Sequence, residues 1–326
     1  MTNSSSVGPS DSQPIENLPL LLGVDGGGTK TLAWVAQVDQ QGTEAVLGEG
    51  YAGSSNQLAV GVEAALDNLA EAIEKACDHA RLSPNQIAAA VFALAGAGDE
   101  GARQRVLKFA KQRFHIPSAQ VIHDGQAVLE AATPDGWGLA LIAGTGAVAF
   151  GKNQQGETAV VGGWGYWFGD EGSAYWLGQA ALRAIAQATD GRGPDTLLSE
   201  KVLDRLELTN PRGILAELLE QGDTRLAIAD LADLVCEAAE QNDAVANSLL
   251  DEATHHWIQH LTCLADQLGM DRPLRIALAG GVFAGSQLAR DRFTERLVEQ
   301  QLSTEPNELV RVPVLGCVLL ASRLSS

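Results

Sequence analysis

The stretch LLLGVDGGGTKTLAWVAQVD covers residues 20–39 and decides how the rest of the chain is interpreted. Apolar residues predict a buried strand over Leu18–Val24, and a second strand is predicted over residues 31–39. Between the two stand Asp25, three consecutive glycines and Thr29. Glycine permits positive φ and lets backbone N–H groups come close to ligand oxygen atoms. The stretch therefore predicts a hairpin whose turn can lie against phosphate groups.

Two commoner phosphate-binding motifs do not fit these residues. A Walker A loop is GxxxxGK[ST]; Gly23 and Gly28 have its spacing, but Thr29 stands where the lysine belongs and Lys30 follows one position late. A Rossmann fingerprint opens a helix, whereas these glycines lead into a segment typical of a strand. A plain β-turn is the structural alternative, although such a turn needs only one or two glycines.

Downstream, predicted strands and helices alternate, which indicates an α/β fold. The predicted strands are a third strand within residues 44–57, followed by Ile87–Leu94, Ala119–Ile122 and Leu274–Leu278; the predicted helices are Val62–Arg81, Arg103–Arg113, a helix behind residues 123–125, most of Ser173–Leu268, Ser286–Gln301, and an apolar helix that follows a strand end within residues 312–324.

A second pattern of strand, glycine turn and strand appears in GLALIAGTGAVAFGKNQQG, residues 138–156. The distance from Thr145 to its closing QQG nearly matches the distance from Thr29 to the QQG turn expected at Gln40–Gly42. Repeated supersecondary units of this kind indicate that the chain contains two similar halves.

Composition excludes several classes of protein. The 326 residues carry a net charge of −19 without a basic cluster, which argues against nucleic acid or an anionic membrane as partner. Four scattered cysteines without a C-x-x-C pair indicate buried thiols in a reducing compartment. Residues 1–17 are polar and are expected to form a disordered leader, not a signal peptide. With no run long enough to span a bilayer, a cytoplasmic protein is expected.

Five motifs, in order, resemble a known family: DGGGTKT, HDGQAVLEAA, LIAGTGAVAFG, GGWGYWFGDEGSAYWLG and ALAGGVFAG. The chain resembles the N-acetylglucosamine kinase group, which sits with the BadF/BadG/BcrA/BcrD-type ATPases in the actin-like superfamily. The resemblance runs from about residue 20 to the C-terminus. It implies two actin-like, ribonuclease-H-like α/β lobes with a nucleotide cleft between them. The expected lobes are residues 18–134, completed by helix 314–326, and residues 135–313 with a helical insertion.

The resemblance implies ATP and Mg²⁺ as cofactors. The first turn would surround the β- and γ-phosphates, the second would approach them from the opposite side, and a third glycine pair would lie under adenosine. An aspartate before the first turn can hold hydrated Mg²⁺ near the phosphates. For the third pair the alternative is an ordinary turn from strand to helix. The residues so assigned are Asp25 (also the metal ligand), Gly26, Gly27, Gly28, Thr29 and Lys30, then Gly144, Thr145 and Gly146, and finally Gly280 and Gly281.

The resemblance also makes Asp124 the catalytic base. A carboxylate within hydrogen-bond reach can take the proton of a sugar hydroxyl as the bond to phosphorus forms. The alternative is that Asp124 is only the N-cap of the helix behind it. Neighbouring His123 is assigned no role. His255, His256 and His260 lack a carboxylate as third ligand, so a solvated helix face is expected there and not a metal site.

Sugar-binding residues are expected in two segments. Asn56 matches an asparagine that contacts sugar hydroxyls in related kinases, although it can instead cap its own turn. The expected contacts in the GGWGYWFGDEGS segment are Gly163, Trp164, Asp170 and Glu171, with Asp170 as the principal carboxylate. Trp167 and Phe168 are expected in the core, and Ser173 is expected to cap the following helix.

We therefore expect an ATP- and Mg²⁺-dependent kinase that phosphorylates an amino sugar, N-acetylglucosamine or glucosamine, at its 6-hydroxyl. Ala95 stands where animal members have a sugar-holding serine, so recognition of the N-acetyl group stays open. Two alternatives remain: an ATPase that drives a partner protein, and a sugar-sensing protein without catalysis. Branches that need an iron–sulfur or zinc cysteine cluster are disfavoured, because no suitable cysteines are present. A homodimer is compatible with the resemblance.

Overall fold

A computed structural model describes residues 15, 17–39, 42, 44–133, 135–302 and 307–325. The chain divides into two compact units, which we call unit 1 (Met1–Gly136 with Val312–Ser326) and unit 2 (Trp137–Arg311). Each unit is described by itself. Most of the leader expected at residues 1–17 lies outside the described residues, as do Gln40 and Gln41 of the expected QQG turn.

Unit 1 is built on a five-stranded mixed sheet with the strand order β3-β2-β1-β4-β5. β1 runs antiparallel to β2 and parallel to β4, which in turn runs parallel to β5. The central strand, β1, therefore ends at the hairpin turn that leads into β2, and beside this end lies the connection from β4 to α3. The strands are β1 (Leu20–Gly26), β2 (Lys30–Val38), β3 (Glu44–Gly53), β4 (Ile87–Leu94) and β5 (Ser118–His123).

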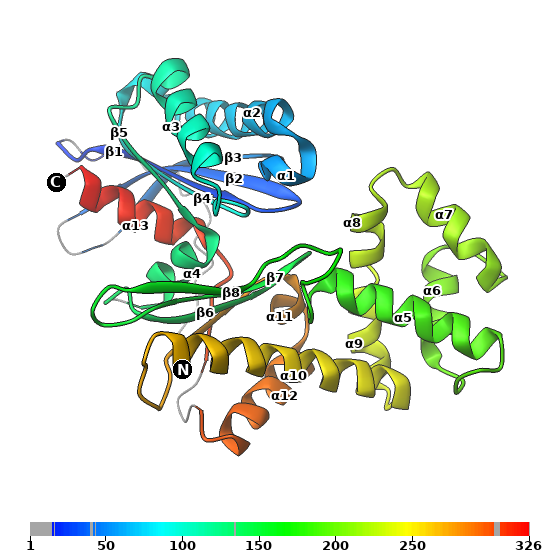
Figure 1. The fold of residues 1–326 in the computed structure, drawn as a ribbon. Helices are drawn as coiled ribbons and strands as arrows, with labels where there is room; N and C mark the ends of the chain where they lie inside the picture. The colour runs from blue at the N-terminus through cyan, green and yellow to red at the C-terminus, as the bar shows by residue number, and fades with distance from the viewer. Residues whose placement is uncertain are drawn as a thin grey trace. The chain divides into compact units, whose positions relative to one another are not determined.

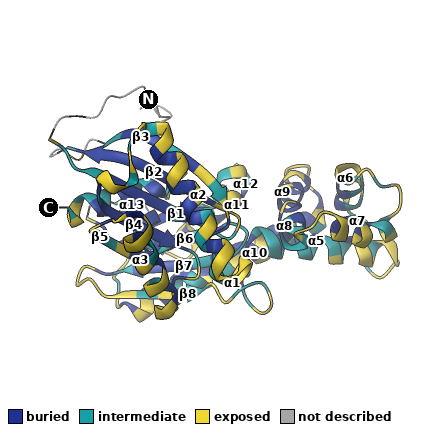
Figure 2. Ribbon diagram, turned by 90° about the horizontal axis from the view of Figure 1, so that it is seen from above, coloured by how far each residue is buried: buried dark blue, intermediate teal, exposed yellow. Residues whose placement is uncertain are grey.

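Helices cover both faces of this sheet, giving three layers (Figure 1). Alternate residues of β1 point to opposite faces, as strand geometry requires. Leu22 and Val24 join one core cluster with α2 and α3, whereas Leu21 joins another with α4 and α13. The strands are largely buried, and the helices carry exposed residues on their outer sides (Figure 2). The helices of unit 1 are α1 (Gln57–Val60), α2 (Val62–Ala80), α3 (Glu100–Phe114), α4 (Asp124–Ala132) and α13 (Val314–Leu324).

Unit 2 contains a second five-stranded sheet, with the order β10-β9-β6-β7-β8. Numbered within the unit, this is the same order as in unit 1, and the antiparallel and parallel pairings also correspond. The two similar halves predicted from the repeat are thus confirmed at the level of topology. The strands are β6 (Gly138–Ala143), β7 (Ala147–Lys152), β8 (Thr158–Gly162), β9 (Ile276–Ala279) and β10 (Glu308–Leu309).

The long helix α10 forms the centre of the core of unit 2. Its Trp257 is fully buried and packs with Phe283 and Phe293, at ring-centroid distances of 4.6 and 6.2 Å. The predicted helical region between residues 173 and 268 is confirmed. The helices of unit 2 are α5 (Ala174–Thr189), α6 (Leu197–Arg205), α7 (Ile214–Glu220), α8 (Thr224–Ala229), α9 (Ala232–Glu240), α10 (Ala244–Gln267), α11 (Gly281–Gly285) and α12 (Gln287–Glu299).

The predicted α/β class is confirmed, and several details differ. β1 lies two residues later than predicted, whereas β4 matches the prediction Ile87–Leu94. β8 and the two-residue β10 were not predicted. The buried-thiol expectation is confirmed for Cys77, Cys236 and Cys317 and is wrong for Cys263, which is exposed.

Glycines in β3 allow α2 to lie directly on the sheet. A Cβ added at Gly50 would come within 2.1 Å of the Ala72 carbonyl oxygen and 2.5 Å of the Ala76 nitrogen, both in the backbone of α2. Gly48 makes a similar approach, with 2.2 Å to the Ala76 carbonyl oxygen. Because the obstacles are backbone atoms, a larger side chain can be accommodated only if the helix moves.

We predict that Gly50→Ala lowers the free energy of unfolding by about 1–3 kcal/mol or more, through overpacking between β3 and α2. The measurement is urea or thermal unfolding followed by circular dichroism. Gly285→Ala is the matched control, because a Cβ there meets no atom within 4 Å. Equal stability of the two variants would contradict the close approach.

Candidate functional site

The first glycine turn joins β1 to β2 and is held by hydrogen bonds from two other loops. Within the turn, the Gly27 amide donates to the Lys30 carbonyl at 2.9 Å. The Ala95 amide, after β4, donates to the Gly26 carbonyl at 2.8 Å, and the Ser54 hydroxyl, after β3, donates to the Gly27 carbonyl at 3.1 Å. The other predicted residues of this segment come next in the chain. Gly28 and Thr29 form the tip of the turn, and Lys30 begins β2. Three strand ends of unit 1 therefore meet at this turn.

Gly26 is required by packing and not by an unusual backbone conformation. A Cβ at Gly26 would lie 2.0 Å from the Ser55 hydroxyl oxygen and 2.5 Å from Leu94 Cδ2. Among the described residues, the glycines with positive φ do not include Gly26 or Gly27. Of the two properties of glycine considered for this turn, positive φ does not apply to Gly26 and Gly27, and close approach of the neighbouring loop is the physical reason for Gly26.

Two carboxylates of unit 1 lie close enough to influence each other. Asp25 stands near the end of β1, and Asp124 is the first residue of α4 after β5. The pKa of Asp25 is raised to about 7, mainly by burial and also by the negative charge of Asp124, while the charge of Lys30 acts in the opposite direction. The sequence-predicted metal ligand and the sequence-predicted base thus belong to one electrostatic site.

His123 contacts the Asp124 carboxylate directly. Its Nδ1 lies 2.8 Å from Asp124 Oδ1, and both side chains are only 17% exposed. The Gly125 amide donates to the same oxygen at 2.9 Å. Burial raises the pKa of Asp124, but the hydrogen bond and charge of His123 and the Gly125 amide lower it by more, so the pKa lies below its ordinary value.

His123, and not Asp124, occupies the N-cap position of α4. The interpretation of Asp124 as only a cap therefore does not describe this helix start. Sequence reasoning gave His123 no role, although its position between a strand end and an expected base was a usable signal. A side chain next to a buried carboxylate in the chain is well placed to donate a hydrogen bond to it.

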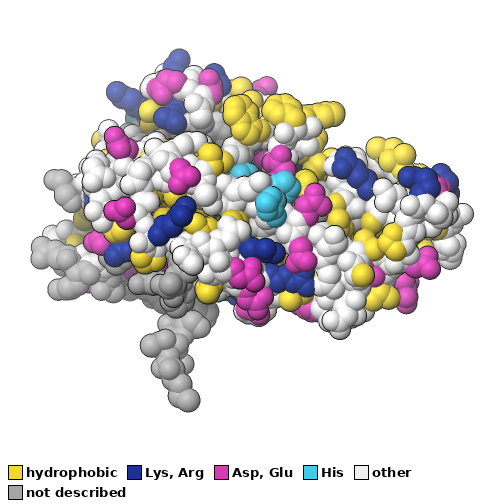
Figure 3. All heavy atoms as spheres, turned by 60° about the horizontal axis from the view of Figure 1, so that its bottom comes forward, with side chains coloured by type: hydrophobic (Ala, Val, Ile, Leu, Met, Phe, Trp, Pro, Cys, Tyr) yellow, Lys and Arg dark blue, Asp and Glu magenta, His cyan; other side chains and the backbone are white. Residues whose placement is uncertain are grey.

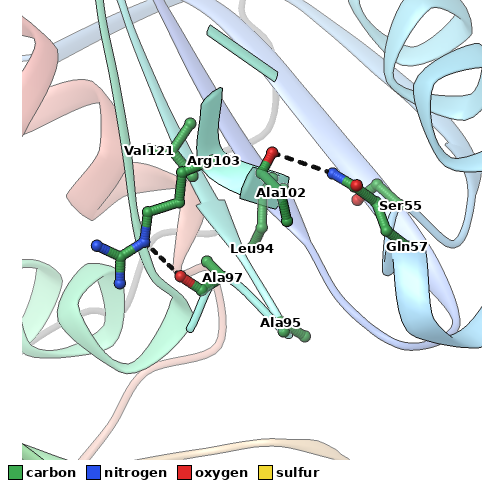
Figure 4. Close-up of a pocket in the computed structure, with 9 residues that line it drawn as sticks. Ser55, Gln57, Leu94, Ala95, Ala97, Ala102, Arg103 and Val121 are labelled. Carbon is green, nitrogen blue, oxygen red and sulfur yellow. Dashed lines mark hydrogen bonds between the residues drawn. The ribbon is translucent and has the colours of Figure 1, made fainter. Parts of the chain in front are cut away.

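Asn56 lies on the loop that holds the first turn. Its side-chain oxygen accepts from the Leu58 amide at 3.0 Å and caps α1, which is the alternative raised for it from the sequence. Nearby, Ala95 and Ser55 line a small cavity of about 10 Å³ (Figure 4). The buried Ser55 hydroxyl has no hydrogen-bond partner among the described residues. A cavity of this size holds about one water molecule, which would satisfy that hydroxyl.

The second glycine turn, in unit 2, occupies the corresponding place between β6 and β7. The Gly144 amide donates to the Gly146 carbonyl at 2.9 Å, and the Ala174 amide donates to the Gly144 carbonyl at 2.8 Å. Thr145 lies at its centre. The turn is thereby attached to the start of α5.

The third glycine pair, Gly280 and Gly281, lies next to this second turn. Gly280 has a φ of 97°, and a Cβ there would lie 2.3 Å from the Ala143 carbonyl oxygen and 2.7 Å from the Gly144 nitrogen. A Cβ at Gly281 would meet no atom within 4 Å. Gly280 is thus required by the protein's own packing, whereas the space over Gly281 is open to a ligand.

Asp170 fastens the GGWGYWFGDEGS segment to the second turn. It is buried, has a positive φ of 60°, and accepts hydrogen bonds from the backbone amides of Ala147 and Gly165. Its Oδ2 lies 2.7 Å from the position of a Cβ at Gly146. Burial raises the pKa of Asp170, and the two amides and the charge of Arg225 partly offset this.

The aromatic residues of this segment point away from the core. Trp164, Trp167 and Phe168 are 73%, 81% and 76% exposed. The expectation that Trp167 and Phe168 belong to the core is wrong, because Asp170 and the glycines fix the loop backbone at the surface. Tyr166 stacks on Trp167 with a centroid distance of 5.2 Å, and we call the three exposed rings of this loop, Trp164, Trp167 and Phe168, the exposed aromatic cluster.

The remaining predicted residues of the segment lie around this cluster. Gly163 has a φ of 70°, and its amide donates to the Ala147 carbonyl at 2.9 Å, so it directs the chain away from β8. Glu171 is partly buried, and its charge acts on both Asp170 and His260. Ser173 caps α5, as predicted, by accepting from the Trp176 amide at 3.1 Å.

The histidines of α10 do not assemble a metal site. Within the described ranges, no group of three or more His, Cys, Asp and Glu side chains is arranged to hold a metal ion. His255 is exposed, as expected, but His260 is partly buried against Gly162, so the helix face is not uniformly solvated.

On the face drawn in Figure 3, acidic and basic side chains are interspersed. None of the helices in the described part of the chain has the length and apolar character needed to cross a membrane.

Two α/β units with one strand order, each with a glycine turn between its first two strands, define an actin-like fold. Residues 22–321 match the BadF/BadG/BcrA/BcrD ATPase family, and the chain belongs to that family.

Similar proteins carry sugar kinase names. A relative from Clostridium acetobutylicum, named N-acetylmuramic acid/N-acetylglucosamine kinase, is 28% identical over 85% of this chain and 90% of its own length. The glucosamine kinase GspK from Vibrio cholerae is 32% identical over 56% of this chain and 60% of its own length. A solved structure from Chromobacterium violaceum, described provisionally as an N-acetylglucosamine kinase, has a TM-score of 0.74 at 27% identity, covering 93% of this chain and 99% of that one.

The raised pKa of Asp25 predicts a pH-dependent stability. The folded chain keeps this proton up to about pH 7, whereas the unfolded chain loses it near pH 3.8, so the stability that the protonated form contributes is lost as the pH rises between these values. Asp25→Asn removes the titration. The quantity compared is the unfolding free energy of Asp25→Asn minus that of the wild type. We expect this difference to be about 1–3 kcal/mol larger at pH 8 than at pH 5.

This is measured by urea unfolding in EDTA at the two pH values. Asp78→Asn, at an exposed position on α2, is the control and should show no such growth. A pH-independent difference for Asp25→Asn would show that the pKa of Asp25 is not raised.

The contacts of Asp170 predict a local effect. Asp170→Ala leaves two backbone amides without their acceptor, and it places alanine, which has no polar side chain, at a positive φ. We therefore expect the free energy of unfolding to fall by about 1–3 kcal/mol and amide exchange over residues 163–172 to become faster. Asp170→Asn keeps an acceptor oxygen and tolerates positive φ, so it should retain most of the protection. Hydrogen exchange with mass spectrometry reports the outcome, and unchanged exchange in Asp170→Ala would refute the tie.

Proposed function

We propose that this chain is an ATP-dependent sugar kinase that transfers the γ-phosphoryl group of ATP to an amino sugar. The substrate is N-acetylglucosamine or glucosamine, and the acceptor is the 6-hydroxyl. Family membership and the names of the relatives support the class of reaction. The proposal includes a cytoplasmic location, where ATP is supplied.

The observation that carries the proposal is the proximity of Asp124 to Asp25. β1, β4 and β5 run parallel, so Asp25 near the end of β1 and Asp124 directly after β5 lie at the same edge of the sheet as the first glycine turn. A phosphotransferase needs this combination, because catalysis of phosphoryl transfer is mostly positioning and charge stabilisation next to a group that receives the acceptor's proton.

Asp124 is assigned as the general base. As the sugar oxygen bonds to the γ-phosphorus and the bond from phosphorus to the β–γ bridging oxygen of ATP breaks, the hydroxyl proton passes to the Asp124 carboxylate. The lowered pKa keeps Asp124 ionised at neutral pH and makes it a weak base. That suits a loose transition state, in which the hydroxyl becomes acidic only once its bond to phosphorus is forming.

The residues of unit 1 fit Mg²⁺ held mainly through water and phosphate oxygens. Magnesium is usually bound by one or two carboxylates plus substrate phosphates, and Asp25 offers one buried carboxylate that also feels the charge of Asp124. We assign Asp25 to this ion, which when bound neutralises phosphate charge. The phosphates are assigned to Gly26–Lys30 and to Gly144–Gly146, and the space over Gly281 to the base or ribose.

For the sugar we assign the amide nitrogen of Asn56, since its oxygen is used by the cap of α1. The exposed ring of Trp164 is suited to cover the apolar face of a sugar ring, and Gly163 and Glu171 border it. Asp170 is assigned to hold this loop, because its carboxylate is engaged with backbone amides. The choice between an N-acetyl and a free amino group depends on the surroundings of Ala95.

The test is release of ADP in the presence of ATP and Mg²⁺ with a panel of sugars that includes glucosamine, N-acetylglucosamine, N-acetylmuramic acid and glucose. We expect one amino sugar to raise the rate well above the rate without sugar, and phosphorus NMR of the product to locate the phosphate on the 6-oxygen. A rate that no sugar raises would sink the kinase proposal.

Asp124→Asn should reduce kcat about 10²–10⁴-fold while ATP affinity stays nearly unchanged, because the base acts on the acceptor hydroxyl and not on the nucleotide. Steady-state kinetics and nucleotide titration measure the two quantities. Asp243→Asn is a matched control, since Asp243 caps α10 in unit 2. Unimpaired turnover in Asp124→Asn would remove this role.

One observation favours a second candidate, an ATPase that drives a partner protein. The exposed aromatic cluster of Trp164, Trp167 and Phe168 is the kind of apolar surface that such a partner would bind. This candidate predicts ATP turnover that no sugar changes, so the same panel separates the two.

A further inference from the structure

We propose that His123 is a positioning residue that binds one carboxylate oxygen of Asp124 through its Nδ1–H and thereby directs the other oxygen at the acceptor hydroxyl. The inference rests on the proposed function for the identity of the hydroxyl. Its structural core, a fixed tautomer of one imidazole, is independent of the substrate.

Three polar atoms form a closed triangle at the start of α4. His123 Nδ1 lies 2.8 Å from Asp124 Oδ1 and 3.1 Å from the Gly125 nitrogen, and that nitrogen lies 2.9 Å from Asp124 Oδ1. All three distances are within hydrogen-bond range. Only two protons can serve these contacts, one on the Gly125 amide and one on either the imidazole or the carboxyl group.

The charge of the carboxylate decides where the second proton lies. If Asp124 is ionised and Nδ1 carries no proton, two lone pairs face each other at 2.8 Å, which is repulsive. If Nδ1 carries the proton, it donates to Oδ1 and the Gly125 amide donates to the same oxygen. An aspartate carboxyl group is ordinarily ionised at neutral pH, and the Gly125 amide already donates to Oδ1, so the second arrangement is the one that applies.

Two donors on Oδ1 restrict rotation of the carboxylate about its Cβ–Cγ bond. Oδ2 is then the oxygen that faces away from His123. A general base must offer a lone pair in hydrogen-bond reach of the proton that it receives. His123 thus selects the oxygen that becomes protonated when the hydroxyl oxygen bonds to phosphorus and the bond to the β–γ bridging oxygen breaks.

The groups around the pair explain why such a donor is needed. The charged groups nearby are Asp25, on β1, and Lys30, on β2: the charge of Asp124 raises the pKa of Asp25, and the charge of Lys30 lowers it. On β4, the residue paired with His123 is the apolar Leu94. Burial by itself raises the pKa of Asp124, so without the His123 donor a protonated carboxyl group would be favoured.

The backbone of His123 is itself well fixed, as a positioning residue requires. It ends β5 in extended conformation, with φ −68° and ψ 140°, and its register on β4 is set by parallel pairing. Its side chain is 17% exposed, so few rotamers are open to it.

The first experiment separates positioning from helix capping by three substitutions. His123→Ala removes donor and acceptor, His123→Asp keeps an acceptor for the Gly125 amide but has no donor, and His123→Asn has both. We expect kcat to fall about 10²-fold in the Ala and Asp variants with KM for ATP and sugar nearly unchanged, and to stay within about tenfold of wild type in the Asn variant.

The acid limb of the pH profile for kcat/KM should also move to higher pH in His123→Ala, because loss of a donor to the ionised form raises the pKa of Asp124. Thermal unfolding checks that each variant is folded. If His123→Asp is folded and as active as wild type, capping suffices and the positioning proposal is overturned; the Asp and Asn variants decide the matter even if His123→Ala does not fold.

The second experiment needs no activity. Nitrogen NMR of imidazole-labelled, ligand-free protein at pH 8 should show His123 protonated on Nδ1 and unprotonated on Nε2. In Asp124→Ala the acceptor is gone, so Nδ1 should accept from the Gly125 amide and the proton should move to Nε2. An unprotonated Nδ1 in the wild type would overturn the proposal whatever the sugar panel shows, and a protonated Nδ1 beside a failed panel would leave only the kinase assignment wrong.

Discussion

The local structure of unit 1 depends on keeping two carboxyl groups, those of Asp25 and Asp124, partly buried and close to each other. Asp25 lies near the end of β1 and Asp124 directly after β5, two strands separated in the sheet by β4, and the charge of Asp124 raises the pKa of Asp25. Such an arrangement works against stability, and proteins keep it where a site needs it. His123 and the Gly125 amide lower the pKa of Asp124, and Lys30 lowers the pKa of Asp25, so each favours the ionised form of one carboxyl group. The local structure at these strand ends can be understood as the means of keeping both carboxylates in place.

The two glycine turns are built on one physical principle, although their neighbours differ. In unit 1 the Ser55 hydroxyl occupies the space that a Cβ of Gly26 would need, at 2.0 Å. In unit 2 Asp170 Oδ2 occupies the space that a Cβ of Gly146, directly before β7, would need, at 2.7 Å. Each bare backbone is thus pressed against a polar side chain from an adjacent loop. The glycines make the turns rigid by close packing, which pre-organises backbone amides for a ligand.

Patterns with a strong local cause could be predicted from the sequence. The apolar run of β4 and the helical spacing of α2 gave both elements nearly to the residue, and the repeated hairpin gave the two similar halves. β10 has only two residues and β8 has mixed burial, so neither carries a periodic signal.

The side-chain environments were less accessible to sequence reasoning. Trp167 and Phe168 were assigned to the core on their apolar character, but the tie between Asp170 and the backbone of Ala147 and Gly165 fixes their loop at the surface. The role of His123 depends on a distance of 2.8 Å to its neighbour's side chain, which no spacing rule gives. Tertiary contacts, and not propensity, decide both cases.

The course of the chain through unit 1 has a consequence for its synthesis. α13, formed by the last residues, covers one face of the first sheet and comes so close that a Cβ at Gly23 would lie 2.8 Å from Val318 Cγ2. α13 follows the whole of unit 2 in the chain, so during translation that apolar face stays uncovered until residues 314–324 have left the ribosome. The nascent chain therefore exposes one apolar face of the first sheet during synthesis. Exposed apolar surface of this kind promotes aggregation, and chaperones bind it.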